Sequence, residues 1–155
     1  LGLKKKKTNI KTYNMLKGIL SIAGQSGLFK LVSQGNNSII VESLTDGKRM
    51  PAHGTSRVSA LEDISMYTED GDVKLSYVFA CIYDFTKGEK CIDAKKASAA
   101  EIKEYMGNVL PNWDKEHIYM SDLKRLFTWF NILIDKNIIT AENAKAAQEE
   151  NKDEE

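Results

Sequence analysis

The stretch IIVESLTDGKRMPA, residues 39–52, decides how the first half of the chain folds. It places Asp46 and Gly47 between two extended, largely apolar runs. An Asp-Gly pair in this setting is a strong signal for a β-hairpin, because a type I′ turn requires positive φ at both of its central residues. We therefore predict two antiparallel strands that turn at Asp46 and Gly47.

Further short strands are predicted on both sides of this hairpin. LKGILSIA and LFKLVS precede it, and the turn-forming GNN, residues 35–37, separates LFKLVS from the hairpin. After the hairpin, RVSALEDISMYT places Ser59 three residues before Glu62, a capping-box spacing that predicts one helical turn and then a last strand at residues 64–67. Such closely spaced strands suit a small closed or half-closed barrel of the SH3-like type, which we expect over residues 15–68.

The hydrophobic period changes to a helical one after the polar TEDGD, residues 68–72. Ser98 with Glu101 forms a second capping box, and Ser121 or Asp122 is expected to cap a further helix that carries Lys124 and Arg125 on its polar face. The apolar positions of the first and the last of three helices are Leu75, Val78, Phe79, Ile82 and Tyr83, and Leu123, Leu126, Phe127, Phe130, Leu133 and Ile134. We therefore predict an α+β protein in which a three-helix unit over residues 73–139 follows the barrel.

The two ends of the chain carry opposite charge, although the 155 residues contain 22 Lys and Arg against 22 Asp and Glu. Residues 1–14 hold a lysine run without an acid, and we expect this basic arm to lie upstream of the true start at Met15. Residues 140–155 are acidic and alanine-rich; they could extend a frayed helix, and we expect an acidic disordered tail. The part between the two ends is close to neutral, which lowers the expectation of nonspecific nucleic-acid binding.

The apolar runs and the cysteines of the chain bear on its cellular location and redox state. Its longest apolar runs fall far short of the roughly 20 residues of a membrane span, so no membrane association is expected. Cys81 and Cys91 are too few for a disulfide framework, and no signal-peptide pattern is present. These features favour a cytoplasmic protein with reduced thiols.

The glycine pair Gly24 and Gly27 resembles a phosphate-binding loop only at first sight. A phosphate loop opens the N-terminus of a helix, so that free N–H groups point at the anion. Here the pair is followed by LFKLVS, which has the composition of a strand. We therefore interpret Gly24 and Gly27 as part of a connection between two strands.

Catalytic and metal-binding patterns are not found in the sequence. His53, His117, Cys81 and Cys91 have no ligand spacing, and no Gly-x-Ser-x-Gly elbow is present. Paired acids such as Glu62 and Asp63 fall at turns and helix starts, where they act as dipole partners. We therefore predict no enzymatic activity, no cofactor and no metal.

Candidate binding residues gather in GKRMPAHGTSR, residues 47–57, which is cationic and contains no acid. Surface loops on a rigid barrel are where binding residues concentrate. Trp113 follows a proline in a loop and is either an exposed aromatic or a plug between the two domains, whereas Trp129 is expected in a core or a domain interface. The candidate binding set is Lys48, Arg49, His53, Arg57 and Trp113.

Four strings carry a resemblance to a known family: MLKGILSIAGQSGLFKLVSQ, IIVESLTDGKRMPA, VSALEDISMYT and VLPNWDKEHIYMSDLKRLFTWFNIL. With these strings the chain resembles a family of uncharacterised two-domain proteins of the phylum Bacteroidota, over nearly all of residues 15–139. The resemblance implies a β-rich N-terminal domain of unknown function followed by a helical C-terminal domain. It implies no activity, cofactor or site residue.

Two functions from different classes are compatible with this sequence. The first is a cytoplasmic binding or adaptor module for protein–protein interaction, with an unknown protein as its partner. The alternative is an RNA- or ribosome-associated factor that uses the basic edge of the barrel, because small barrels often present loops to nucleic acid. Binding to RNA would depend steeply on salt, whereas binding to one protein would depend on it less.

Overall fold

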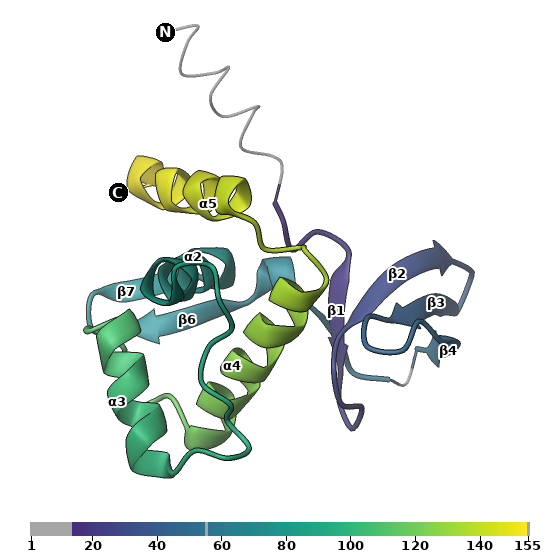
Figure 1. Cartoon of the computed structure of the whole chain (residues 1–155). Coiled ribbons are helices and arrows are strands. Elements are labelled where there is room, and N and C mark those ends of the chain that lie inside the picture. The colour runs from purple at the N-terminus through teal and green to yellow at the C-terminus, as the bar shows by residue number, and fades with distance from the viewer. Residues whose placement is uncertain (1–13, 55, 155) are drawn as a thin grey trace, which may run out of the picture.

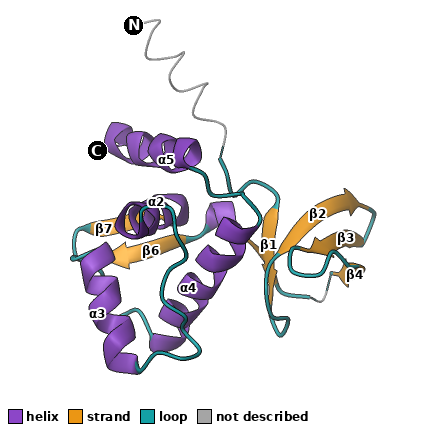
Figure 2. Cartoon of the chain, viewed as in Figure 1, coloured by secondary structure: helices purple, strands orange, loops and turns teal. Residues whose placement is uncertain are grey.

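The computed structural model describes residues 14–54 and 56–154, and it has a sheet-rich first half and a helix-rich second half (Figure 1). The expected basic arm lies outside the described residues except for Asn14. Asn14 accepts hydrogen bonds from the backbone N–H groups of Leu16 and Lys17, at 2.8 and 3.0 Å. The mixed composition of helices and strands confirms the predicted α+β class (Figure 2).

The first half forms one antiparallel sheet of five strands in the order β4-β3-β2-β1-β5. The strands are β1 (Ile19–Ile22), β2 (Phe29–Gln34), β3 (Ser38–Ser43), β4 (Arg49–His53) and β5 (Val58–Ala60). In the described part of the chain β4 and β5 are the two edges and do not pair, so the closed form of the expected barrel is absent. Two features favour open edges: β5 has only three residues, and Pro51 in β4 has no N–H to donate.

The hairpin predicted at Asp46 and Gly47 is confirmed, but its turn is not of type I′. Gly47 has φ +74°, whereas Asp46 is not among the described residues with positive φ. The Gly47 N–H donates to the Ser43 carbonyl, and the Ser43 N–H donates to the Lys48 carbonyl, both at 2.9 Å. The loop therefore has four residues, and only its last residue needs the left-handed conformation that glycine adopts readily.

The last strand predicted for the barrel belongs to a different sheet. The short 3₁₀ helix η1 (Leu61–Asp63) leads to β6 (Ser65–Thr68), which pairs with β7 (Gly71–Lys74) and not with the five-stranded sheet. Gly71, with φ +115°, lets the chain turn back directly after β6. The predicted cap is also wrong, because Ser59 lies within β5 and no side chain caps η1.

The second half contains the three helices predicted for residues 73–139 and one more. They are α2 (Leu75–Thr86), α3 (Ala99–Val109), α4 (Met120–Asp135) and α5 (Ala141–Glu154). The capping box of α3 is confirmed: the Glu101 N–H donates to Ser98 Oγ at 3.2 Å, and the Ser98 N–H donates to Glu101 Oε1 at 2.8 Å. The cap of α4 is Tyr119 and not Ser121 or Asp122 as predicted; Asp122, the third residue of the helix, accepts a hydrogen bond from the Tyr119 N–H at 3.0 Å.

The helix α5 corrects the expectation of a disordered tail, since Ala141–Glu154 is helical. In Figure 1 it lies beside α2, and two side-chain contacts agree with that position. Gln148 donates a hydrogen bond to Asp84 of α2, and Lys74 Nζ lies 2.8 Å from Glu150 Oε1. Ala144 and Ala147, one turn apart, are buried, because their small side chains allow α5 to approach closely.

Two apolar cores hold these elements. A small core inside the five-stranded sheet contains Leu20, Ile22, Phe29, Val41 and Ala52. A large core contains residues from both halves, and its members include Met15, Leu16, Ile19, Leu28, Leu61, Phe79, Phe127, Phe130 and Leu133. The apolar positions predicted for the helices are buried in it, except that Tyr83 and Ile134 are half-buried.

Strand β1 joins the two cores, because successive side chains of a strand point to opposite faces. Leu20 and Ile22 belong to the small core, whereas Ile19 belongs to the large one. Ser21, on the same face as Ile19, borders a groove shared with α4. The sheet and the helical half are therefore packed together through β1.

Candidate functional site: a groove along helix α4

The cationic residues predicted to form one binding patch are distributed over the sheet. Arg49 and His53 lie at opposite ends of β4, paired in register with Glu42 and Ser38. At roughly 3.3 Å per residue, four residues of strand separate them by about 13 Å. Arg49 Nε lies 3.1 Å from Glu42 Oε1 in an exposed ion pair, and Lys48 is exposed in the adjoining turn.

Arg57 follows the His53 end of this strand through a tight turn, in which the Ser56 N–H donates to the His53 carbonyl at 2.9 Å. It directly precedes β5, at the other edge of the sheet, and its carbonyl accepts a hydrogen bond from the Ala23 N–H at 2.9 Å. Its side chain borders the groove along α4. The structure therefore places His53 and Arg57 near one end of β4 and Lys48 and Arg49 at the other end, and the four cations do not form one patch.

The possibility that Trp113 is an exposed aromatic is wrong, because only 3% of it is exposed. Its backbone forms a bridge with Thr68 of β6, and Lys115 Nζ lies 5.2 Å from the centre of its ring. Among the described residues, no hydrogen-bond acceptor reaches the buried Trp113 Nε1. Trp113 therefore packs the connection between α3 and α4 against β6, and its buried ring is not accessible to a ligand.

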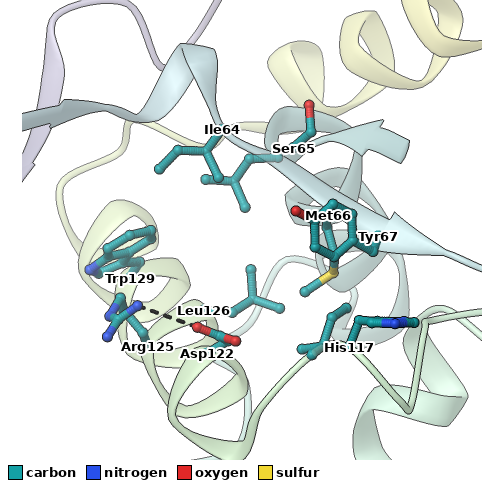
Figure 3. A pocket seen from close by; sticks show the side chains of 11 residues that line it. Ile64, Ser65, Met66, Tyr67, His117, Asp122, Arg125, Leu126 and Trp129 are labelled. Atoms are coloured by element: carbon teal, nitrogen blue, oxygen red, sulfur yellow. Dashed lines mark hydrogen bonds and ion pairs between the residues drawn. The ribbon is translucent and has the colours of Figure 1, made fainter. Parts of the chain in front are cut away.

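The groove along α4 has an apolar end between β6 and α4, with a volume of about 250 Å³ (Figure 3). The side chains of Met66, Ile118, Leu126 and Trp129 line it and are themselves largely buried. The remaining lining residues are Ile64, Ser65, Tyr67, Leu75, His117, Asp122 and Arg125. In the close view, Arg125 and Asp122 lie side by side on α4, joined by a contact of 3.5 Å.

The cationic end is larger, at about 930 Å³, and lies between the β1–β2 loop and α4. Ile64, Arg125 and Trp129 line both ends, so the two adjoin along α4, and we refer to them together as the α4 groove. Four cations border the cationic end, and no carboxylate is among the described residues that line it. These cations are Arg57, Lys95, Lys124 and Arg125.

The local sequence explains how these side chains reach the groove. On α4, Leu126, Phe127 and Phe130 are buried, so Lys124 and Arg125 remain on the outer face of the helix. Across the groove, Gly24 and Gly27 have φ of +82° and +81°, which confirms their role in the connection between β1 and β2. A side chain at Gly27 would also crowd Thr45 Oγ1, 3.3 Å from the position of its Cβ.

Titratable groups near the groove show ordinary structural roles. His117 Nδ1 lies 2.7 Å from Asp114 Oδ2. Desolvation acts to raise the pKa of Asp114, but hydrogen bonds from the His117 side chain and from the backbone N–H groups of Glu116 and His117 outweigh it and lower the pKa. This carboxylate is therefore held ionised by the turn that precedes α4.

The cysteines are poor nucleophiles. Burial raises the pKa of Cys91 to about 12, and its thiol lies 3.4 Å from the Phe127 carbonyl oxygen. Burial also raises the pKa of Cys81. Because the thiolate is the reactive form, both thiols are expected to be protonated and unreactive near neutral pH.

The described residues include neither a metal-binding cluster nor a membrane-spanning helix. Residues 14–54 and 56–154 contain no group of three or more His, Cys, Asp or Glu that could hold a metal ion. Within the same ranges, every helix is too short or too polar to cross a bilayer.

Sequence reasoning missed the groove, although part of its signal was visible. Lys124 and Arg125 were placed correctly on the polar face of their helix. Nothing in the sequence brings them to Arg57, since 67 positions separate Arg57 and Lys124 in the numbering. Lys95 lies in the connection between α2 and α3 and carries no pattern of its own.

The architecture is that of a two-part α+β protein, and two family models divide the chain in the same way. Residues 16–61 match a domain of unknown function (DUF5606), and residues 64–133 match another (DUF6852). The two matches meet at η1, between the five-stranded sheet and the β6–β7 hairpin. No curated protein matches the chain.

A solved structure shows the same arrangement. The solution NMR structure of a protein from Bacteroides vulgatus, a structural genomics target, is 44% identical to this chain. The match covers 81% of this chain and 89% of that protein, with a TM-score of 0.69. The chain belongs to this Bacteroidota family of two-domain proteins, and the resemblance seen in the sequence is confirmed.

Proposed function

We propose that this protein is a non-enzymatic, cytoplasmic binding module whose α4 groove holds an acidic segment of a partner protein. One observation carries the proposal: Arg57, Lys95, Lys124 and Arg125 border the cationic end of an open groove whose described lining contributes no carboxylate there. A groove lined by one sign of charge attracts and orients a ligand of the opposite sign.

The two walls of the groove suit a binding role. One wall is the β1–β2 loop and the start of β5, carried by a sheet that we propose to be a half-open relative of the SH3-like barrels. Its strand order and separate small core support that assignment. The other wall is α4, whose buried face is anchored in the large core. Rigid walls reduce the ordering that a bound segment must bring about.

A protein is favoured over RNA as the partner by the aromatic residues. Nonspecific RNA binding usually places exposed aromatic rings beside the cations, so that bases can stack on them. Trp129, the aromatic residue that lines the cationic end, is largely buried. An acidic protein segment, in contrast, can bind through ion pairs between its carboxylates and the cations, without an exposed ring. Binding to RNA is the alternative outcome of the experiment.

The test is affinity capture from the native cell, with and without nuclease, using the full chain and two charge-reversal variants. The groove variant carries Arg57→Glu, Lys124→Glu and Arg125→Glu. The control variant carries Lys30→Glu, Lys48→Glu and Arg49→Glu, which are exposed residues of β2, of the β3–β4 turn and of β4. The two are matched, because each reverses three charges and each breaks one exposed ion pair, Arg125 with Asp122 or Arg49 with Glu42.

We expect one protein to be recovered by the wild-type chain and by the control variant, with or without nuclease, and to be lost from the groove variant. Thermal unfolding should show that both variants remain folded. Loss of recovery after nuclease would instead support the RNA-associated alternative. Undiminished recovery by the groove variant would show that the groove is not the binding site.

A further inference from the structure

We infer that the acidic segment binds in an extended conformation, with an apolar side chain in the apolar end of the α4 groove and the carboxylates that follow it at the cationic end. The inference rests on the proposed function, and it names the sequence type of the partner. It also assigns a second recognition element, the outer edge of β6.

The outer edge of β6 has backbone groups that face the groove. In an antiparallel pair, alternate residues direct both backbone groups toward the partner strand or away from it. Ile64 accepts a hydrogen bond from the Leu75 N–H at 3.0 Å, on the side of β7, so Met66 and Thr68 also face β7. Ser65 and Tyr67 therefore face the opposite edge.

This opposite edge is used at one end and open at the other. The Tyr67 carbonyl accepts a hydrogen bond from the Asp114 N–H at 3.1 Å, and the Glu69 N–H donates to the Asn112 carbonyl at 2.8 Å. Ser65 lies beyond this contact and borders the apolar end of the groove. Within the described chain, no hydrogen bond to another residue occupies the outward N–H and C=O of Ser65. An extended peptide can pair with them by strand addition.

The apolar end suits one apolar side chain beside that strand edge. Met66, Leu126 and Trp129 form its floor, and Tyr67, which is 52% exposed, stands at its rim (Figure 3). An apolar side chain placed there would cover these surfaces and lose its own contact with water.

Charge fixes the direction of the segment along the groove. The apolar end includes the carboxylate of Asp122, which would repel an acidic side chain. The cationic end includes Lys95, Lys124 and Arg57, which would attract one. Arg125 lies at the junction of the two ends. An apolar residue followed by acids is therefore favoured over the same residues mixed at random.

The experiment measures the binding of synthetic peptides to the full chain by fluorescence anisotropy, with ¹⁵N NMR to locate the contact. The probe is a peptide of about eight residues, long enough to span roughly 26 Å when extended, with leucines followed by glutamates. A glutamate-only peptide tests the charge alone. A third peptide has the probe sequence with its leucine backbone nitrogens methylated, which removes the donors needed for strand pairing.

Two protein variants test the strand edge. Ser65→Pro removes the outward N–H, and the preceding Ile64 already has the extended conformation, φ −88° and ψ 135°, that a following proline requires. Asp72→Pro is the matched control, since Asp72 pairs in register with Tyr67 and directs its N–H to the other edge of the same hairpin.

We expect the probe to bind about tenfold more tightly than the glutamate-only peptide, and methylation to weaken it roughly three- to tenfold, as for lost backbone hydrogen bonds. Ser65→Pro should weaken binding of the probe peptide by the same factor, and Asp72→Pro should leave it unchanged. The Ser65 amide signal should shift on binding. Equal affinity of the probe and its methylated form would overturn the inference, even if Ser65→Pro fails to fold.

The outcome also separates this inference from the proposed function. If the groove variant loses both acidic peptides while methylation has no effect, the acidic site stands and the extended strand is wrong. If the groove variant binds both peptides as the wild type does, the proposed function itself fails.

Discussion

The small core of the five-stranded sheet and the large core of the helices differ in which parts of the chain they join. The small core uses residues of the first family domain alone, such as Phe29 and Val41. The large core combines Leu16 and Leu28 from the first domain with Phe127 and Phe130 from the second. The boundary between the two family domains therefore does not coincide with a boundary in the packing.

The largest effect is expected at the centre of the large core. Phe130→Ala should destabilise the protein by about 3–5 kcal/mol, because Phe130 is fully buried and its ring centre lies 6.2 Å from that of Phe79. Denaturant unfolding measures this loss. Phe85→Ala is the control, since Phe85 is 45% exposed and should cost clearly less. Similar losses for the two variants would mean that Phe130 is not at the centre of the core.

Leu16→Ala tests whether the large core joins the two family domains. Leu16 is fully buried in that core, so we expect a loss of about 2–5 kcal/mol. We also expect the circular dichroism signals of strands and helices to be lost in one shared transition. Two separate transitions, with the helical one unchanged by Leu16→Ala, would show that the domains are energetically independent.

Val41→Ala makes the matching change in the small core. Val41 is fully buried there, and the lost methyl groups predict a loss of about 2 kcal/mol, at roughly 0.8 kcal/mol for each buried carbon plus a cavity cost. Native-state hydrogen exchange should show faster opening of β3 amides than of α4 amides. If α4 amides are accelerated as much as those of β3, the two cores behave as one.

The smallest effect is expected on the surface of the sheet. Arg49→Ala should change the unfolding free energy by at most about 1 kcal/mol, because the side chains of Arg49 and Glu42 are 64% and 33% exposed and water screens their interaction. Chemical denaturation with urea at low and high salt measures this difference. A loss as large as that of Val41→Ala would show that the ion pair stabilises the sheet edge to an unexpected degree.

The features that the structure confirms are those with a local signal in the sequence. The hairpin at Asp46 and Gly47, the capping box of Ser98 and Glu101, and the burial of Phe127 and Phe130 each depend on a few neighbouring residues. The predicted pairing of β6 with the barrel was wrong, because the sequence of a strand does not specify which strand it pairs with. The prediction of a disordered tail was wrong because contact with α2, through residues such as Ala144, stabilises α5 as a helix.

The candidate site shows the same division. The sequence placed Lys124 and Arg125 on the polar face of a helix, and it grouped Lys48, Arg49, His53 and Arg57 because they are neighbours in the chain. Along β4, neighbours in the chain are separated in space, since an extended strand advances by roughly 3.3 Å per residue. Trp113 was predicted to be either an exposed aromatic or a plug between the two domains, and its contacts with β6 and the large core bury it.

By itself, the sequence determined the order and type of most elements and the apolar faces of the helices, because turn chemistry and hydrophobic period act over a few residues. The family followed from four distinctive strings of residues. Only the tertiary structure decided that β1 joins two cores, that β6 pairs with β7, and that Arg57 meets Lys124 and Arg125 across one groove. These features depend on contacts between residues far apart in the chain. Such contacts form where the burial of apolar surface brings the elements together, and no local pattern records them.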